Sequence, residues 1–230
     1  MIRLENIEKS FPISTGKLTV LKGINLRISK GEFVAITGPS GSGKSTLMAL
    51  LGCLDRPTSG QVLINGTDVS TLSDNDEADL RSRTIGFVFQ AFHLIQSLTI
   101  LENVEIPLFY AGVPHRERRT RALKALEKVG LGPRCGHKPP ELSGGEQQRA
   151  AIARALIREP EILLADEPTG NLDSKTCAQI MTIFESVRDA GKTVLIITHD
   201  QSIAAKASRQ IKLNDGLIES DSTLTFQHGS

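Results

Sequence analysis

The chain has 230 residues, with 27 Lys and Arg against 26 Asp and Glu. This balance excludes a broad basic face for nucleic acid, and an aromatic content of 4% without tryptophan argues against a surface on which bases stack. No apolar run approaches the roughly 18 residues that a membrane span requires, and charged side chains between Arg3 and Lys9 interrupt the segment where a signal peptide would lie. We therefore expect a cytoplasmic protein without a membrane span of its own.

The first ninety residues carry the pattern of strands. Apolar residues alternate over Ile2–Phe11 and Leu18–Ile28, which predicts two antiparallel strands joined by a loop. Phe33–Thr37 and Ile85–Phe89 are short apolar runs typical of buried strands, and Gln61–Ile64 before Asn-Gly indicates a strand that ends in a tight turn.

A phosphate-binding loop follows the strand at Phe33–Thr37. The pattern is G-x-x-x-x-G-K-S/T, and it is continued by helix-forming residues. Its glycines allow successive N–H groups to surround an anion, and the helix that follows adds a partial positive charge. Lys44 can reach the outer phosphates, and the Ser45 hydroxyl can ligate Mg²⁺. A phosphate loop alone fits kinases, GTPases and many ATPases, so it predicts only that a nucleotide binds. The residues expected to bind it are Gly38, Pro39, Ser40, Gly41, Ser42, Gly43, Lys44, Ser45 and Thr46.

From about residue 91 to residue 158 the pattern becomes helical. Thr99 and Glu102 have the spacing of a capping box, and Arg116–Val129 carries apolar residues at helical spacing before it stops at Gly130. We interpret residues 91–158 as a helical subdomain inserted into an α/β core.

The α/β pattern returns after residue 158. Apolar runs and a capped helix are followed by a closing hairpin, and residues 221–230 are expected to form a tail because they lack periodicity. The expected elements are a strand at Glu161–Asp166, a helix capped by Asp173, a strand at Thr193–Thr198, and a hairpin of Arg209–Leu213 with Leu217–Glu219.

Two acidic residues end the strand at Glu161–Asp166. Open α/β sheets place ligands at the carboxyl ends of their strands, so Asp166 can hold Mg²⁺ across from Ser45. Glu167 can polarise an attacking water as a general base. Beside a phosphate loop, these acids are better explained as functional than as ordinary surface residues.

The stretch Leu142, Ser143, Gly144, Gly145, Glu146 opens a predicted helix. It resembles the LSGGQ signature of the ATP-binding cassette (ABC) family, about a hundred residues after the phosphate loop. The resemblance implies a head-to-tail dimer in which each signature closes over ATP held by the other subunit. Ser143, Gly144 and Gly145 would then offer a hydroxyl, N–H groups and the helix dipole to the γ-phosphate. Glu146 replaces the usual Gln, and we expect an altered rate rather than inactivity.

The resemblance assigns further positions. Gln90 matches the Q-loop, which implies a contact with Mg²⁺ and water, and His199 matches the switch histidine that bonds the γ-phosphate. Phe11 lies where the family keeps an aromatic residue against adenine. The D-loop, which crosses the dimer interface, matches Asn171, Leu172 and Asp173.

The resemblance covers nearly the whole chain. It implies an α/β P-loop NTPase fold in which a RecA-like mixed sheet and an antiparallel β subdomain form the core, at residues 1–90 and 159–220. Gly86–Leu94, Glu102–Val104 and Ala165–Asp173 resemble the macrolide-export and lipoprotein-release branch (MacB/LolD-like). This resemblance implies an Mg²⁺-dependent ATPase that works as a homodimer. It also implies that the homodimer binds an integral-membrane permease and so lies at the inner face of the cell membrane.

Other functions compete with this interpretation. A regulatory ABC ATPase of the cell-division type would act through a membrane partner without transport, and the sequence does not separate the two. ABC proteins of translation or DNA repair usually have two cassettes or a long coiled-coil insertion, and a P-loop kinase would not need the signature. The sequence does not identify the transported substrate.

Overall fold

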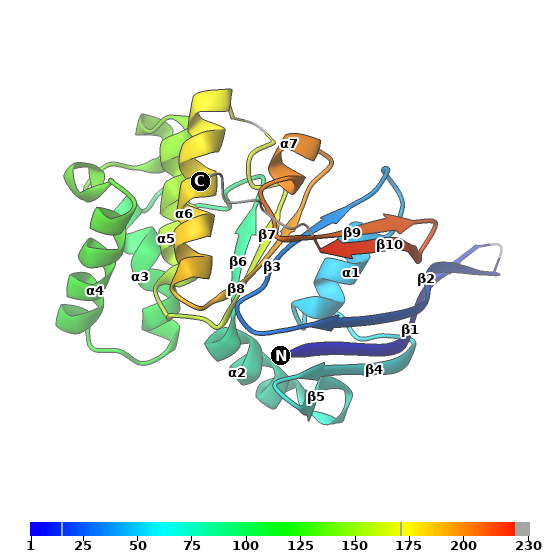
Figure 1. Cartoon of the computed structure of the whole chain (residues 1–230). Helices are drawn as coiled ribbons and strands as arrows, with labels where there is room; N and C mark the ends of the chain where they lie inside the picture. Colours follow the sequence, from blue (N-terminus) through cyan, green and yellow to red (C-terminus); the bar gives the residue numbers. More distant parts are fainter. Residues whose placement is uncertain (15, 171, 224–230) are drawn as a thin grey trace.

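A computed structural model of the chain describes residues 1–14, 16–170 and 172–223 (Figure 1). Its main sheet contains six strands in the order β10-β9-β3-β8-β7-β6. The strands from β9 to β6 pair in parallel and β10 pairs antiparallel at the edge. The strands are β3 (Phe33–Thr37), β6 (Ile85–Phe89), β7 (Ile162–Asp166), β8 (Thr193–Ile197), β9 (Arg209–Asn214) and β10 (Leu217–Thr223).

The central strands β3, β7 and β8 are buried on both faces, which explains why they are continuous apolar runs rather than alternating ones. In β3, Val34 and Ile36 belong to one hydrophobic cluster, whereas Phe33 and Ala35 belong to the cluster on the other face. The second cluster includes Ile180 and other residues of α6 (Ser174–Asp189). The first includes residues of α1 (Lys44–Leu51) and of a second sheet.

The second sheet is antiparallel, with the order β2-β1-β4-β5. Ile2, Leu4 and Ile64 turn their side chains into the first cluster, so the alternation in the sequence correctly predicted a sheet with one buried face. Its strands are β1 (Ile2–Ile13), β2 (Gly16–Ile28), β4 (Ser59–Ile64) and β5 (Thr67–Asp68). Figure 1 shows this sheet in blue and cyan, on the opposite side of the molecule from the green helices.

The helices between β6 and β7 form a third hydrophobic cluster, which includes Ile100, Val104, Leu126 and Ala150. Thr99 and Glu102 make the predicted capping box at the start of α3. A separate core explains why this part of the chain reads as a distinct helical unit (Figure 1). The helices are α3 (Ile100–Tyr110), α4 (His115–Lys128) and α5 (Gly144–Leu156), with α2 (Asp74–Thr84) before β6 and α7 (Gln201–Ala204) after β8. Among the described residues, no helix is long and apolar enough to cross a bilayer.

The expected tail is wrong for residues 221–223. β10 continues to Thr223, and Asp221 pairs opposite Ile211 of β9. The Asp221 carboxylate also accepts two hydrogen bonds from Arg209, at 2.7 and 2.6 Å. A polar edge strand held by backbone and ionic contacts shows no hydrophobic periodicity, which is why the sequence did not reveal it. The rest of the expected tail, residues 224–230, lies outside the described residues.

Candidate active site

A cavity of about 700 Å³ opens at the carboxyl ends of β3, β7 and β8. It brings together nearly all of the predicted phosphate loop, both predicted acids and the predicted histidine. Its lining residues are Leu18, Val20, Gly38, Pro39, Ser40, Gly41, Gly43, Lys44, Ser45, Thr46, Asp166, Glu167, Ile197 and His199. The Ser42 side chain is buried beneath the loop.

The loop depends on glycine at two kinds of position. Gly41 and Gly43 have φ angles of 78° and 102°, in the left-handed region that favours glycine. A Cβ atom at Gly38 would collide with the backbone oxygen of Leu213 at the end of β9. The turn after β9 also supports the loop, because the Gly216 N–H donates to the Ser42 carbonyl at 3.1 Å.

The start of α1 faces the cavity with its positive end. No side chain caps its first N–H groups, and its first turn contains no acidic residue. Lys44 adds a full charge there, since its Nζ donates to the Gly38 and Pro39 carbonyls at 2.8 Å each and is thereby held across the loop. The combination is suited to a polyphosphate.

Asp166 lies at the end of β7 on the wall of the cavity. Burial raises the pKa of its carboxyl group, the charge of Glu167 raises it further, and Lys44 opposes both effects. A half-buried carboxylate with a like charge beside it is stabilised by a cation. Together with the exposed Ser45 hydroxyl, it fits the oxygen-donor chemistry of Mg²⁺.

The Glu167 carboxylate is fixed by donors from the segment after β8. Its Oε1 accepts a hydrogen bond from the His199 backbone N–H at 3.1 Å and lies 2.7 Å from His199 Nδ1. Its Oε2 accepts from the Thr198 hydroxyl at 3.3 Å. Because a carboxylate only accepts, the proton of this contact resides on Nδ1. The carboxylate is therefore preoriented at the cavity wall.

Gln90 follows β6 and packs beside this arrangement without lining the cavity. A Cβ atom at Gly170 would lie 2.9 Å from Gln90 Nε2, so the amide lies against the turn after Glu167. Phe11 also lies outside the lining. It pairs with Leu18 across β1 and β2, and the Lys9 ammonium lies 5.0 Å from its ring centroid.

The predicted signature lies away from this cavity. Ser143 caps α5, and neither the residues from Leu142 to Glu146 nor Leu172 and Asp173 line the cavity of their own chain. A Cβ atom at Gly144 would contact Leu172 at 3.4 Å, so the signature and the predicted D-loop pack together. Asp173 caps α6, while Asn171, the first predicted D-loop residue, lies outside the described residues.

Comparison with known proteins agrees with this geometry. The family model described as ABC transporter matches residues 21–170. The ABC transporter ATP-binding protein YvrO of Bacillus subtilis is 50% identical over 228 residues, which cover 99% of this chain and 100% of YvrO. The chain belongs to the ABC transporter ATP-binding family.

This cassette is similar to two further proteins whose descriptions bear on its function. The macrolide export ATP-binding/permease protein MacB of Brucella melitensis is 53% identical over 223 residues, which cover 97% of the cassette but 34% of MacB. The cassette MJ0796, solved as a dimer in a post-hydrolysis state with ADP and Pi, matches with a TM-score of 0.91 and 46% identity over 99% of this chain and 100% of that one. The cassette is therefore an ATPase of the expected fold.

Sequence reasoning missed several residues that hold the ABC site together. Gln148 of the signature helix is fully buried, and its Nε2 donates to the Pro168 carbonyl at 2.6 Å and to the Phe89 carbonyl at 3.4 Å. Arg154, in the last turn of the same helix, donates to the carbonyls of Phe92 and His93. A polar residue on a helix gives no sign of such bonds, because its partners come from distant segments.

Two missed residues line the cavity from β2. Val20 and the half-exposed Leu18 extend its apolar wall beyond the phosphate loop. The sequence predicts Leu18 only as a strand residue, because a single exposed apolar side chain is normal on a protein surface and indicates no ligand.

Proposed function

We propose that the cassette is the ATP-hydrolysing part of a transporter and works as a head-to-tail homodimer beneath an integral-membrane permease. The observation that carries the proposal is the division of the site. Lys44, Asp166, Glu167 and His199 share one cavity, whereas the signature at Ser143 lies elsewhere on the same chain. A second copy in head-to-tail arrangement supplies the missing part, and the dimer described for MJ0796 supports this.

The phosphate loop binds the triphosphate through its N–H groups and Lys44, while Leu18 and Val20, with Phe11 beyond them, contact the adenine. Ser45, Gln90 and Asp166 would hold Mg²⁺, which supplies charge neutralisation to the phosphate oxygens.

Hydrolysis depends on the group fixed at the cavity wall. Glu167 accepts the proton of the attacking water, and the bonds from His199 and Thr198 hold its two oxygens in place. His199 also contacts the γ-phosphate through its exposed ring. Across the dimer, Ser143 and the N–H groups of Gly144 and Gly145 stabilise the charge that develops on the γ-phosphate.

The D-loop joins the two sites in this dimer. Leu172 packs on the signature of its own chain, and Asp173 fixes the start of α6. Closure of one site therefore moves Leu172 and Asp173, which lie at the interface with the other site.

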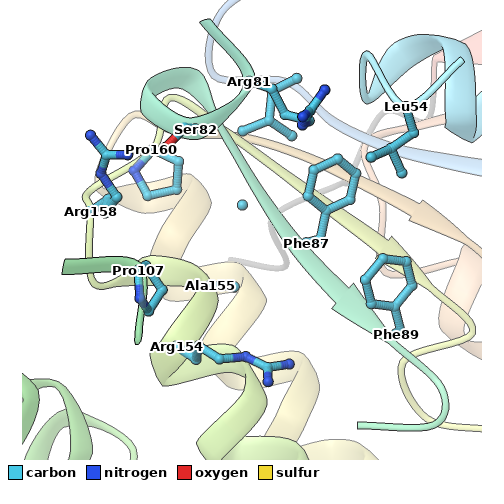
Figure 2. Close-up of a pocket in the computed structure, with 12 residues that line it drawn as sticks. Leu54, Arg81, Ser82, Phe87, Phe89, Pro107, Arg154, Ala155, Arg158 and Pro160 are labelled. Atoms are coloured by element: carbon cyan, nitrogen blue, oxygen red, sulfur yellow. Dashed lines mark hydrogen bonds between the residues drawn. The ribbon is translucent and has the colours of Figure 1, made fainter. Parts of the chain in front are cut away.

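Contact with the permease is assigned to a groove of about 370 Å³ between the core and the helical unit. Figure 2 shows Phe87 and Phe89 along β6, with Pro107, Arg154 and Arg158 across from them. We call it the arginine groove, because its lining includes three arginines and no carboxylate. Its lining residues are Leu54, Arg81, Ser82, Ile85, Gly86, Phe87, Phe89, Pro107, Arg154, Ala155, Arg158 and Pro160.

The arginine groove fits a short permease helix that presents apolar and acidic side chains toward the cytoplasm. Through it the cassette would lie on the inner face of the membrane. Gln90 follows β6 directly, so movement at the nucleotide can reach the permease by this strand. Likeness to MacB, which is described as a macrolide export protein, favours export over a purely regulatory role.

The test is size-exclusion chromatography with light scattering on the Glu167→Gln variant, with and without MgATP. An ATP-dependent dimer is expected, since binding persists while hydrolysis stops. Ser143→Arg in the same background should remain monomeric yet bind ATP. A dimer that survives this second change would contradict the head-to-tail arrangement.

A further inference from the structure

The departure of this chain from the usual signature, Glu146 in place of Gln, has a specific structural role. Glu146 lies in the first turn of α5 and closes a capping box with Ser143. Its Oε2 accepts hydrogen bonds from both the Ser143 N–H and the Ser143 hydroxyl, each at 2.9 Å.

The hydroxyl of Ser143 has a single proton to give. An ionised carboxylate only accepts hydrogen bonds, so in the contact with Glu146 the proton must point toward the carboxylate. Phosphate oxygens of MgATP are acceptors as well. The carboxylate of one chain and the γ-phosphate held by the other therefore compete for the same proton.

Neighbouring groups keep Glu146 charged and in place. The two bonds from Ser143 lower the pKa of its carboxyl group, with smaller contributions from the charges of Arg134 and Arg149. Arg134 Nε lies 3.5 Å from Oε1, and Arg134 Nη1 lies 3.2 Å from His137 Nε2. The carboxylate is thus held from the side away from Ser143 as well.

We propose that Glu146 restrains ATP-driven closure by holding the proton of the signature serine. This inference rests on the proposed head-to-tail dimer and adds a regulator to it. Closure must transfer the Ser143 hydroxyl from Glu146 to the γ-phosphate. A hydrogen bond to a charged acceptor is about twice as strong as one to a neutral amide, so Gln at this position would release the hydroxyl more readily.

The experiment titrates dimer formation with MgATP in the Glu167→Gln background, by light scattering. Adding Glu146→Gln should lower the MgATP concentration for half-maximal dimerisation by roughly five- to tenfold. Adding Glu146→Asp should lower it as well, because the shorter side chain withdraws from the hydroxyl while the charge remains. ATP affinity measured on the monomer should not change in either variant.

A matched control is available at α3, where Glu102 accepts from the Thr99 N–H and hydroxyl at 2.7 Å each. Glu102→Gln removes the same kind of capping carboxylate and should leave dimerisation unchanged. If Glu146→Gln promotes dimerisation but Glu146→Asp does not, repulsion between the carboxylate and the γ-phosphate alone explains the effect, and the inference is overturned. It is also overturned if neither variant lowers the MgATP concentration needed. If no variant dimerises, the proposed dimer itself fails.

Discussion

Glu167 gains its orientation from a single segment, Thr198 and His199, rather than from its own strand. We expect Glu167→Gln to retain ATP affinity while kcat falls by about 100-fold or more, because an amide cannot accept the proton of water. Steady-state hydrolysis and equilibrium binding check the two parts separately. Glu161→Gln, at the residue before β7, is the control and should leave kcat unchanged. Rapid turnover by the Glu167 variant would show that another group is the base.

Lys44 provides the one full positive charge of the phosphate loop. Lys44→Ala should weaken ATP binding by about tenfold or more, since a charge-assisted contact to the phosphates is lost. Isothermal titration with MgATP measures the change. Unchanged affinity would remove the lysine from the binding site, whatever its effect on hydrolysis.

Asp166 is destabilising in its charged form, because burial and Glu167 raise its pKa above the value in the unfolded chain. At pH values below the pKa of the unfolded chain, Asp166 is protonated in both states and costs no stability. Above the pKa of the folded protein, the full cost of the buried charge is present. Asp166→Asn should therefore raise the melting temperature of the nucleotide-free protein at neutral pH, and the gain should vanish in acid. Thermal unfolding across pH checks this. A gain that persists in acid would point to packing instead.

At this scale, the sequence was informative wherever chemistry demands fixed spacing. The phosphate loop and Asp166 with Glu167 were predicted together and share one cavity. Thr198 and Val20 were not, because an ordinary side chain gains its role only from partners that folding brings near. Their contacts are long-range and leave no local pattern.

At the scale of elements, α5 packs so closely against α6 that there is no room for a side chain at Gly145. A Cβ atom there would collide with the Thr176 methyl group of α6. Gly145→Ala should therefore destabilise the protein by about 1–3 kcal/mol and reduce ATP hydrolysis, since α5 must shift to relieve the overlap. Chemical denaturation and hydrolysis assays measure both effects.

Thr176→Ser is the matched change on α6, because it removes the methyl group and keeps the hydroxyl that donates to Asp173 at 2.6 Å. In combination with Gly145→Ala it should restore most of the lost stability. Failure to restore it would mean that backbone freedom, not the overlap, requires glycine at this position.

Elements were predictable in proportion to their burial. The central strands β3, β7 and β8 were located from apolar runs because both of their faces are covered. The end of β10 was missed because its stability comes from Arg209 and Asp221 rather than from apolar burial. The role of α5 as a link, through Gln148 and Arg154, was invisible for the same reason.

At the scale of the whole molecule, the nucleotide cavity and the arginine groove are separate surfaces connected by β6. Arg158→Glu reverses charge in the groove and should reduce co-purification with the permease by about tenfold, while the ATP-driven dimer persists. Lys128→Glu makes the same charge change on exposed α4 outside the groove and should have no effect. Loss of dimerisation by the Arg158 variant would show that the two surfaces are not independent.

The contact of Gly38 with Leu213, and the bond from Gly216 to Ser42, join the phosphate loop to a hairpin formed more than 170 residues later in the chain. During translation the phosphate loop is synthesised early, and the hairpin that supports it is synthesised late. Since domains fold as they emerge from the N-terminus, the nascent protein carries an unfinished loop through most of its synthesis. We therefore expect stable capture of nucleotide only after Gly216 has been made, because the loop lacks these two contacts until then.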